Sequence, residues 1–142
     1  MRPTQNMVET QEITDSAIWE KFVLSYPQAN FLQSWNWSQF HQNLGQQIHR
    51  VGFYQGSELV GVMLSIVEKA KRAAYLTVPG GPLINWSDAE VTTSFRNEIV
   101  RQAQHYGCSF IRVRPQILEI AENAALFKNL GFKWAPMHLH AE

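Results

Sequence analysis

The stretch LVGVMLSIV, residues 59–67, is the most apolar segment of the chain, and it decides the fold class. Because apolar side chains occupy nearly every position, a strand built from it is apolar on both faces. A strand of this kind lies in the middle of a sheet that helices cover on both sides. The sequence therefore predicts a mixed α/β fold with residues 59–67 as a central strand.

Shorter stretches with strand patterns flank this segment. Residues 47–54 precede it, and Gln55-Gly56-Ser57-Glu58 reads as a tight turn between the two strands. Residues 75–78 follow it after a charged turn at residues 69–72. Further strands are expected at residues 8–13, 110–113 and 134–140.

A first helix is expected after Asp15, which is placed to cap it. Ile18, Phe22 and Val23 share one side of this helix, so we expect them to lie in the core. Pro27 ends the helix.

A second helix is expected between Ser34, its cap, and Gly45, its C-terminal glycine. Trp37, Phe40 and Leu44 lie at helical spacing and should face the core. The aromatic cluster Phe31, Trp35, Trp37 and Phe40 is interpreted mainly as core, although one of these rings is suited to stack on a ligand.

Two more helices follow in the second half of the chain. Ser87-Asp88-Ala89-Glu90 predicts a capping box in which Ser87 caps the helix and Glu90 reaches back. This helix runs to about Tyr106, and a short helix is expected at residues 122–130. The order β-α-α-β-β-β-α-β-α-β predicts an α/β (α+β) mixed sheet with helices on both faces. Residues 1–7 are expected to be a loose leader, and residues 8–142 one domain.

The composition excludes several classes of protein. The 142 residues carry 12 basic and 12 acidic side chains, whereas a dedicated nucleic-acid binder usually shows a basic excess. With Cys108 as the single cysteine, no intrachain disulfide can form, which fits a reducing compartment. No run of about 18 apolar residues occurs, so no membrane span is expected. We expect a cytoplasmic protein.

The loop that begins at Pro79-Gly80-Gly81-Pro82 is a candidate anion site. Its glycines should leave backbone N–H groups open to a ligand, and it leads toward a helix N-terminus. The alternative is a strand-to-helix turn in which the glycines serve geometry alone.

Three charged or titratable side chains are further candidates. Arg112 and Arg114 alternate along a strand, so they share one face and suit a phosphate or carboxylate. Their alternative role is a salt-bridged pair with Glu119 or Glu122. His41, near the end of a helix, suits anion binding or proton transfer, or else it complements the helix dipole.

No metal site and no bound cofactor are expected. His138 and His140 share a strand face, but spacing supplies no third ligand. Cys108 starts a strand as a small apolar residue, with no base partner that would make it a nucleophile.

Three segments resemble Fem-type aminoacyltransferases, which add amino acids from aminoacyl-tRNA to peptidoglycan precursors. They are FLQSWNWSQF (31–40), YLTVPGGPLI (75–84), and FIRVRP (110–115) with the later LGF (130–132). The element order and the segment ALFKNLGF (125–132) are also similar to the GNAT acyltransferase fold. The resemblance implies a GNAT-like module, and it covers roughly residues 31–134.

The Fem-type family carries two GNAT-like halves in tandem, and this chain has the length of the first. The resemblance implies that a second GNAT-like domain is missing, that the isolated 142 residues are inactive, and that an exposed interdomain face favours self-association. The implied partners are a muropeptide precursor and aminoacyl-tRNA. The implied substrate-binding residues are Trp37, His41, Tyr75, Gly80, Gly81, Asn85, Arg112 and Arg114.

The chain departs from the family pattern at three of these positions. Gly80 stands where the family usually has Arg, Asn85 where an Asp is common, and His41 where a Lys is frequent. Two other functions therefore stay open: an acyl-CoA-dependent N-acyltransferase and a non-catalytic binding module. Against acyl-CoA, Pro79 and Pro82 remove N–H donors from the loop that would hold the pyrophosphate.

Overall fold

The computed structural model describes residues 7–26 and 30–115. The helix expected at residues 122–130, the strand expected at 134–140, the pair His138 and His140, and the carboxylates Glu119 and Glu122 lie outside the described residues. The described elements are, in chain order, β1 (Val8–Glu12), α1 (Ser16–Ser25), the 3-10 helix η2 (Phe31–Gln33), α2 (Trp35–Asn43), β2 (Gln47–Gln55), β3 (Glu58–Lys69), β4 (Ala74–Pro79), α3 (Ala89–His105) and β5 (Phe110–Arg114).

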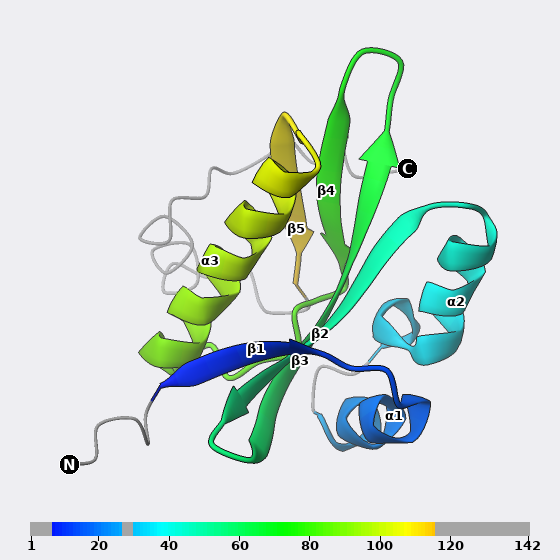
Figure 1. Cartoon of the computed structure of the whole chain (residues 1–142). Coiled ribbons are helices and arrows are strands. Elements are labelled where there is room, and N and C mark those ends of the chain that lie inside the picture. Colours follow the sequence, from blue (N-terminus) through cyan, green and yellow to red (C-terminus); the bar gives the residue numbers. More distant parts are fainter. Residues whose placement is uncertain (1–6, 27–29, 116–142) are drawn as a thin grey trace.

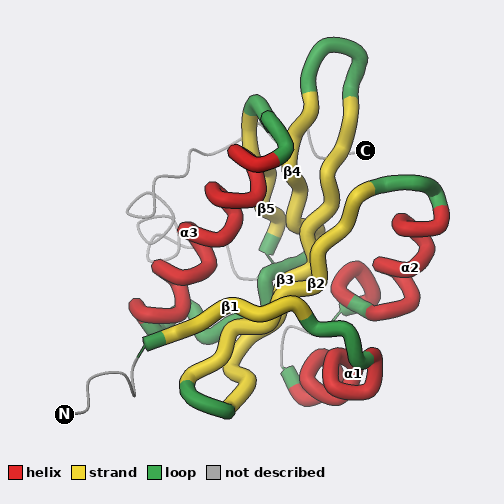
Figure 2. Tube along the Cα trace, viewed as in Figure 1, coloured by secondary structure: helices red, strands yellow, loops and turns green. Residues whose placement is uncertain are grey.

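The strands form one mixed sheet in the order β1-β2-β3-β4-β5. The first four strands pair antiparallel, whereas β4 and β5 pair parallel because α3 carries the chain back between them. Figures 1 and 2 show α3 on one side of the sheet and α1 and α2 on the other. The predicted mixed sheet with helices on both faces is confirmed.

Strand β3 lies in the centre, as the apolar segment 59–67 predicts. Its residues 61–67 are all buried. Met63 and Val67 join the core beneath α3, while Leu64 and Ile66 join the core beneath α1. The two-sided apolar pattern therefore reflects two separate cores, one on each face of the sheet.

Helix α1 turns a different side to the sheet than expected. Asp15 caps it as predicted, accepting a hydrogen bond from the Ala17 backbone N–H at 2.9 Å. Ile18 is 46% exposed, however, whereas Trp19 is fully buried. The Trp19 indole N–H donates to the Gln33 carbonyl at 2.7 Å, so burial leaves no polar group unsatisfied. Placing Ile18 in the core was wrong.

Helix α2 also presents an unexpected face. Ser34 caps it as predicted, but Phe40 and Leu44 are 48% and 63% exposed. The side that meets the sheet carries the fully buried Ser38, whose hydroxyl accepts from Arg50 Nε at 2.7 Å. The prediction that Phe40 and Leu44 face the core was wrong, because the side of α2 that packs on the sheet is the one on which Ser38 binds Arg50.

Helix α3 starts one residue later than a Ser87 cap would place it. Asp88 is the cap and accepts hydrogen bonds from the backbone N–H groups of Glu90 and Val91 at 3.0 and 3.3 Å. The Ser87 backbone N–H instead donates to Asn85 Oδ1 at 3.0 Å. The expected capping by Ser87 was wrong, since a carboxylate one residue on takes its place.

Candidate substrate-binding face

Within residues 7–26 and 30–115, the sheet is left partly uncovered where β4 and β5 lie. Along β4, Leu76 and Val78 point into the core beneath α3 and are fully buried. Tyr75 and Thr77 point to the opposite side and are only half-buried. Among the described helices of that side, α1 packs mainly on β3 and α2 on β2, while η2 reaches the last residue of β4 through Gln33. This uncovered part of the sheet is the candidate face.

A cation held over two aromatic rings lies on the candidate face. Tyr75 and Phe110 are register partners and stack with ring centroids 4.7 Å apart and an interplanar angle of 7°. Arg112 Cζ lies 5.3 Å from the Tyr75 ring centroid and 5.6 Å from that of Phe110. Arg114, exposed at the end of β5, follows two residues later. Contacts of this kind hold a guanidinium group in place.

A hydrogen-bonded chain connects α2 to the same region. Gln46 Nε2 donates to Glu68 Oε1 at 2.8 Å, and Gln46 Oε1 lies 2.5 Å from His41 Nδ1. Because a carboxylate only accepts, Glu68 fixes which end of the Gln46 amide faces His41. His41 Nδ1 must then carry a proton, which leaves Nε2 as the acceptor of the neutral ring. Glu68 is the register partner of Tyr75.

An aromatic ledge, defined as Phe31, Trp37 and Phe40, borders His41. The Trp37 ring centroid lies 5.3 Å from those of Phe31 and Phe40 and 5.0 Å from that of His41. Phe31 is 64% exposed, so placing Phe31 and Phe40 in the core was wrong. Trp35 is half-buried: it packs against the buried Trp19, and Arg50 Cζ lies 3.6 Å from its ring centroid. The ledge presents ring surface to solvent beside a titratable group.

Two amide side chains from the segment before α2 hold the loop after β4. Gln33 is fully buried; its Nε2 donates to the Pro79 carbonyl at 2.6 Å, and its Oε1 accepts from the Leu64 backbone N–H at 2.9 Å. The Gln33 amide thus lies between β3 and β4, beyond the last paired residues of these strands. Asn30 Nδ2 donates to the Gly80 carbonyl at 2.8 Å. These contacts fix the loop relative to α2.

The glycines of this loop permit that close approach. Gly80 has φ +65°, and a Cβ built on it would lie 2.3 Å from Asn30 Oδ1. A Cβ on Gly81 would lie 2.6 Å from Gln33 Cδ. Both glycines are buried, so the structure does not leave them open to a ligand as the sequence suggested. Their packing corresponds to the alternative interpretation, a strand-to-helix turn in which glycines are needed for backbone conformation and close packing.

The structure brings together only part of the predicted set. Trp37 and His41 are in contact, and the Gln46–Glu68 chain leads from them toward Tyr75 and Arg112. Arg114 is the register partner of Pro79, so it lies beside the start of the glycine loop.

Asn85 lies apart from the other predicted residues. It follows Leu83, which pairs with Val62 of β3. Val62 is six residues from Glu68 along that strand, which corresponds to roughly 20 Å. Asn85 is exposed, and its side chain belongs to the turn before α3.

Five residues of this region were not predicted from the sequence: Asn30, Gln33, Gln46, Glu68 and Phe110. Gln46 and Glu68 are far apart in the chain, and nothing in their spacing links them to His41. Gln33 offered one signal in the sequence, since it is a glutamine among aromatic residues. Only the structure shows that it is buried and which backbone groups it binds.

Other kinds of site find little support in the described part of the chain. No group of three or more His, Cys, Asp or Glu side chains is placed to hold a metal ion within residues 7–26 and 30–115. Cys108 is half-buried, and burial raises the pKa of its thiol, which disfavours the reactive thiolate. None of the described helices has the length and apolarity needed to cross a membrane.

Comparisons with known proteins agree with this architecture. The crystal structure of FemX superposes with a TM-score of 0.79 at 21% identity, covering 88% of this chain and 32% of FemX. An aminoglycoside 6'-N-acetyltransferase, AAC(6')-IG from Acinetobacter haemolyticus, superposes with a TM-score of 0.63 at 12% identity, covering 90% and 92%. These likenesses show the GNAT-like fold. The chain spans about a third of the length of FemX.

Sequence comparison identifies the family. A comparison with curated protein sequences finds no significant match. The model of the FemAB family, in contrast, matches residues 14–131. That range covers most of the chain and includes α1, α2, the glycine loop, α3 and β5. The chain therefore belongs to the FemAB family.

Proposed function

We propose that this chain is the precursor-binding half of a peptidoglycan-bridge aminoacyltransferase. The observation that carries the proposal is Arg112, held over the stacked Tyr75 and Phe110 rings on a part of the sheet that the described helices leave uncovered. A guanidinium group in this setting suits a phosphate or carboxylate. Membership of the FemAB family supports the choice of a muropeptide precursor as the anion.

The candidate face offers complementary groups for such a precursor. Arg112 and Arg114 bind its anionic groups, and the aromatic ledge provides ring surface on which a nucleotide base stacks. Gly80 and Gly81 contribute indirectly, because the absence of side chains lets Asn30 and Gln33 approach and fix the loop. Asn85 lies outside this arrangement, so we assign it no contact with the precursor.

The reaction is acyl transfer between two bound substrates. The amine of the precursor attacks the ester carbonyl of the aminoacyl-tRNA, an amide bond forms, and the tRNA ribose hydroxyl leaves. The attacking amine must lose a proton, and the leaving oxygen must gain one. His41 Nε2, the acceptor nitrogen of a ring oriented by Gln46, is placed to carry that proton. Most of the rate enhancement comes from positioning the two substrates.

The complete enzyme requires more than these residues. FemX is about three times as long as the part that this chain matches, so we assign the tRNA-binding surface and the remainder of the active site to a second module. The transfer takes place in the cytoplasm, where both substrates are made. The isolated chain binds the precursor without catalysing the transfer.

A thermal-shift titration tests this assignment. A ligand that binds only the folded state raises the melting temperature, and we expect UDP-MurNAc-pentapeptide to do so while acetyl-CoA does not. Arg112→Ala should abolish the shift. Arg96→Ala, which removes the same charge from α3 on the other side of the sheet, should retain it.

Each competing function predicts a different result. A shift with acetyl-CoA alone would overturn the proposal in favour of an acyl-CoA-dependent acyltransferase. No shift with either ligand would favour a non-catalytic module.

A further inference from the structure

Strand β1 is the last strand of the sheet on its side, within the residues that the structure describes. The Ile13 backbone N–H donates to the Arg50 carbonyl at 2.9 Å, which sets the phase of the ladder with β2. Hydrogen-bonded pairs alternate along an antiparallel ladder. The backbone groups of Glu9 and Gln11 therefore point to β2, and those of Val8, Thr10 and Glu12 point to the outer edge.

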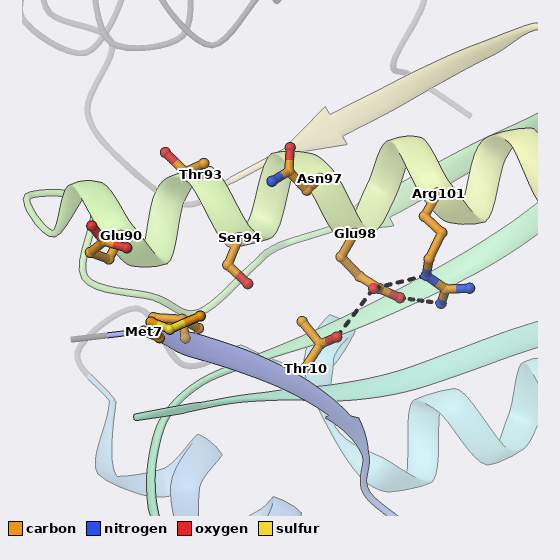
Figure 3. A pocket seen from close by; sticks show the side chains of 9 residues that line it. Met7, Thr10, Glu90, Thr93, Ser94, Asn97, Glu98 and Arg101 are labelled. Atoms are coloured by element: carbon orange, nitrogen blue, oxygen red, sulfur yellow. Dashed lines mark hydrogen bonds and ion pairs between the residues drawn. The ribbon is translucent and has the colours of Figure 1, made fainter. Parts of the chain in front are cut away.

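A groove of about 330 Å³ runs along this edge, between β1 and α3 (Figure 3). Its walls are the side chains of Met7, Val8 and Thr10 on the strand and those of Ser94 and Asn97 on the helix, among others. It lies on the α3 side of the sheet, away from the candidate face. Any strand added beside β1 would direct every second side chain into this groove, because side chains alternate along a strand.

The floor of the groove is already fixed by hydrogen bonds. Glu98 is 5% exposed; it accepts from Arg101 Nη2 at 2.6 Å and from Gln102 Nε2 at 2.8 Å. Thr10 Oγ1 donates to the same carboxylate at 3.4 Å, as Figure 3 shows. The Arg101 charge is therefore paired with the Glu98 carboxylate.

The charged side chains near the groove indicate which kind of partner it favours. Glu90 lines the groove as an exposed carboxylate, and Glu9 and Glu12 are exposed carboxylates on β1 itself, while Arg101, the cation that lines the groove, pairs with Glu98. A second copy of the chain that paired through its own β1 would bring two further carboxylates, its Glu9 and Glu12, to the same edge, and like charges on an edge strand oppose such pairing. A basic segment would be attracted.

We propose that the outer edge of β1 binds an extended, lysine- or arginine-bearing peptide segment by strand addition, with alternate side chains entering the groove beneath α3. Backbone hydrogen bonds to Val8, Thr10 and Glu12 hold the segment, and the surrounding carboxylates favour its cations. This site is separate from the candidate face and does not depend on the transferase function.

Fluorescence anisotropy with a labelled hexapeptide of alternating Thr and Lys tests the proposal. A matched peptide with N-methyl groups on alternate residues keeps the charge and loses backbone donors. We expect the N-methylated peptide to bind about tenfold more weakly, which corresponds to a lost hydrogen bond or more. Equal binding of the two peptides, or no binding of either, would overturn strand addition.

Two variants of one residue locate the site. Thr10→Pro and Thr10→Val both remove the hydroxyl, but only the proline removes the outward N–H, and proline is tolerated on edge strands. We expect Thr10→Pro to weaken binding about tenfold and Thr10→Val to preserve it. Asn97→Arg, on the exposed side of α3, should weaken binding without altering the strand. Unchanged binding in both Thr10→Pro and Asn97→Arg contradicts the site, as does a sedimentation dimer that Thr10→Pro dissociates.

Discussion

The two faces of the sheet are built differently. On the α3 side, Phe95 and Ile99 close an apolar core, and the buried Glu98 is satisfied by Arg101 and Gln102. On the other side, α1 packs mainly on β3 and α2 on β2, and Tyr75 of β4 is half-buried. The comparison shows that the α3 side is closed by a continuous apolar core, whereas polar and aromatic side chains stay partly exposed on the other side, where we propose that the precursor binds.

Truncating one aromatic residue on each side gives the largest contrast. Phe95 is fully buried beneath α3, whereas Phe40 on the ledge is 48% exposed. We expect Phe95→Ala to lower the free energy of unfolding by about 3–5 kcal/mol and Phe40→Ala by no more than about 0.5 kcal/mol. Denaturant unfolding measures both. Equal losses would mean that the ledge is part of the core.

The second contrast concerns two glutamines near α2. Gln33→Leu should lower the free energy of unfolding by about 2–4 kcal/mol, because the Leu64 N–H and the Pro79 carbonyl lose buried partners. Gln42→Leu, on the exposed side of α2, is the matched control and should cost no more than about 0.5 kcal/mol. If Gln33→Leu is as mild as its control, the amide does not hold the loop.

The smallest effect is a dependence of stability on pH that arises on the α3 side. Burial lowers the pKa of His49, and Arg101 and His105 act in the same direction, while Glu12 and Glu98 oppose them. As the pH falls, His49 therefore takes up a proton in the unfolded chain at a higher pH than in the folded chain. This contribution to stability is present above pH 6.5, the ordinary pKa of histidine, and is lost as the pH falls below it.

Denaturant unfolding at about pH 7.5 and about pH 5.5 tests the direction. The wild-type chain should lose stability at the lower pH, and His49→Gln should lose less. Tyr106→Phe removes the hydroxyl 2.8 Å from His49 Nε2 but retains the ring. This variant therefore separates the contribution of the His49–Tyr106 hydrogen bond to the pH dependence from that of burial. A His49→Gln profile that matches the wild type would assign the dependence to other groups.

The sequence predicted the sheet well because its signals are local. The two-sided apolar pattern of residues 59–67 placed β3 in the centre, and Asp15 and Ser34 marked the starts of α1 and α2 correctly. Helix faces were harder to predict. Apolar spacing selected Ile18 and Phe40, yet hydrogen bonds of Trp19 and Ser38 determine which sides of α1 and α2 are buried.

The candidate site could be predicted only in part, since its contacts join distant segments. Arg112 and Tyr75 stand out by residue type and family resemblance. The chain from His41 through Gln46 to Glu68 depends on the register of β2 and β3 and leaves no motif. Gly80 and Gly81 drew attention as a loop for anions, but only the structure shows Asn30 and Gln33 packed against them.

The tryptophan indole N–H signals in a ¹H–¹⁵N NMR titration with UDP-MurNAc-pentapeptide test the central claim most directly. Trp37 belongs to the ledge, Trp19 is buried with its N–H bonded to the Gln33 carbonyl, and Trp86 packs on Phe95 in the opposite core. The account predicts that the Trp37 signal moves with added ligand while those of Trp19 and Trp86 stay in place. Movement of the Trp86 signal with a stationary Trp37 signal would contradict it and place the ligand on the α3 side of the sheet.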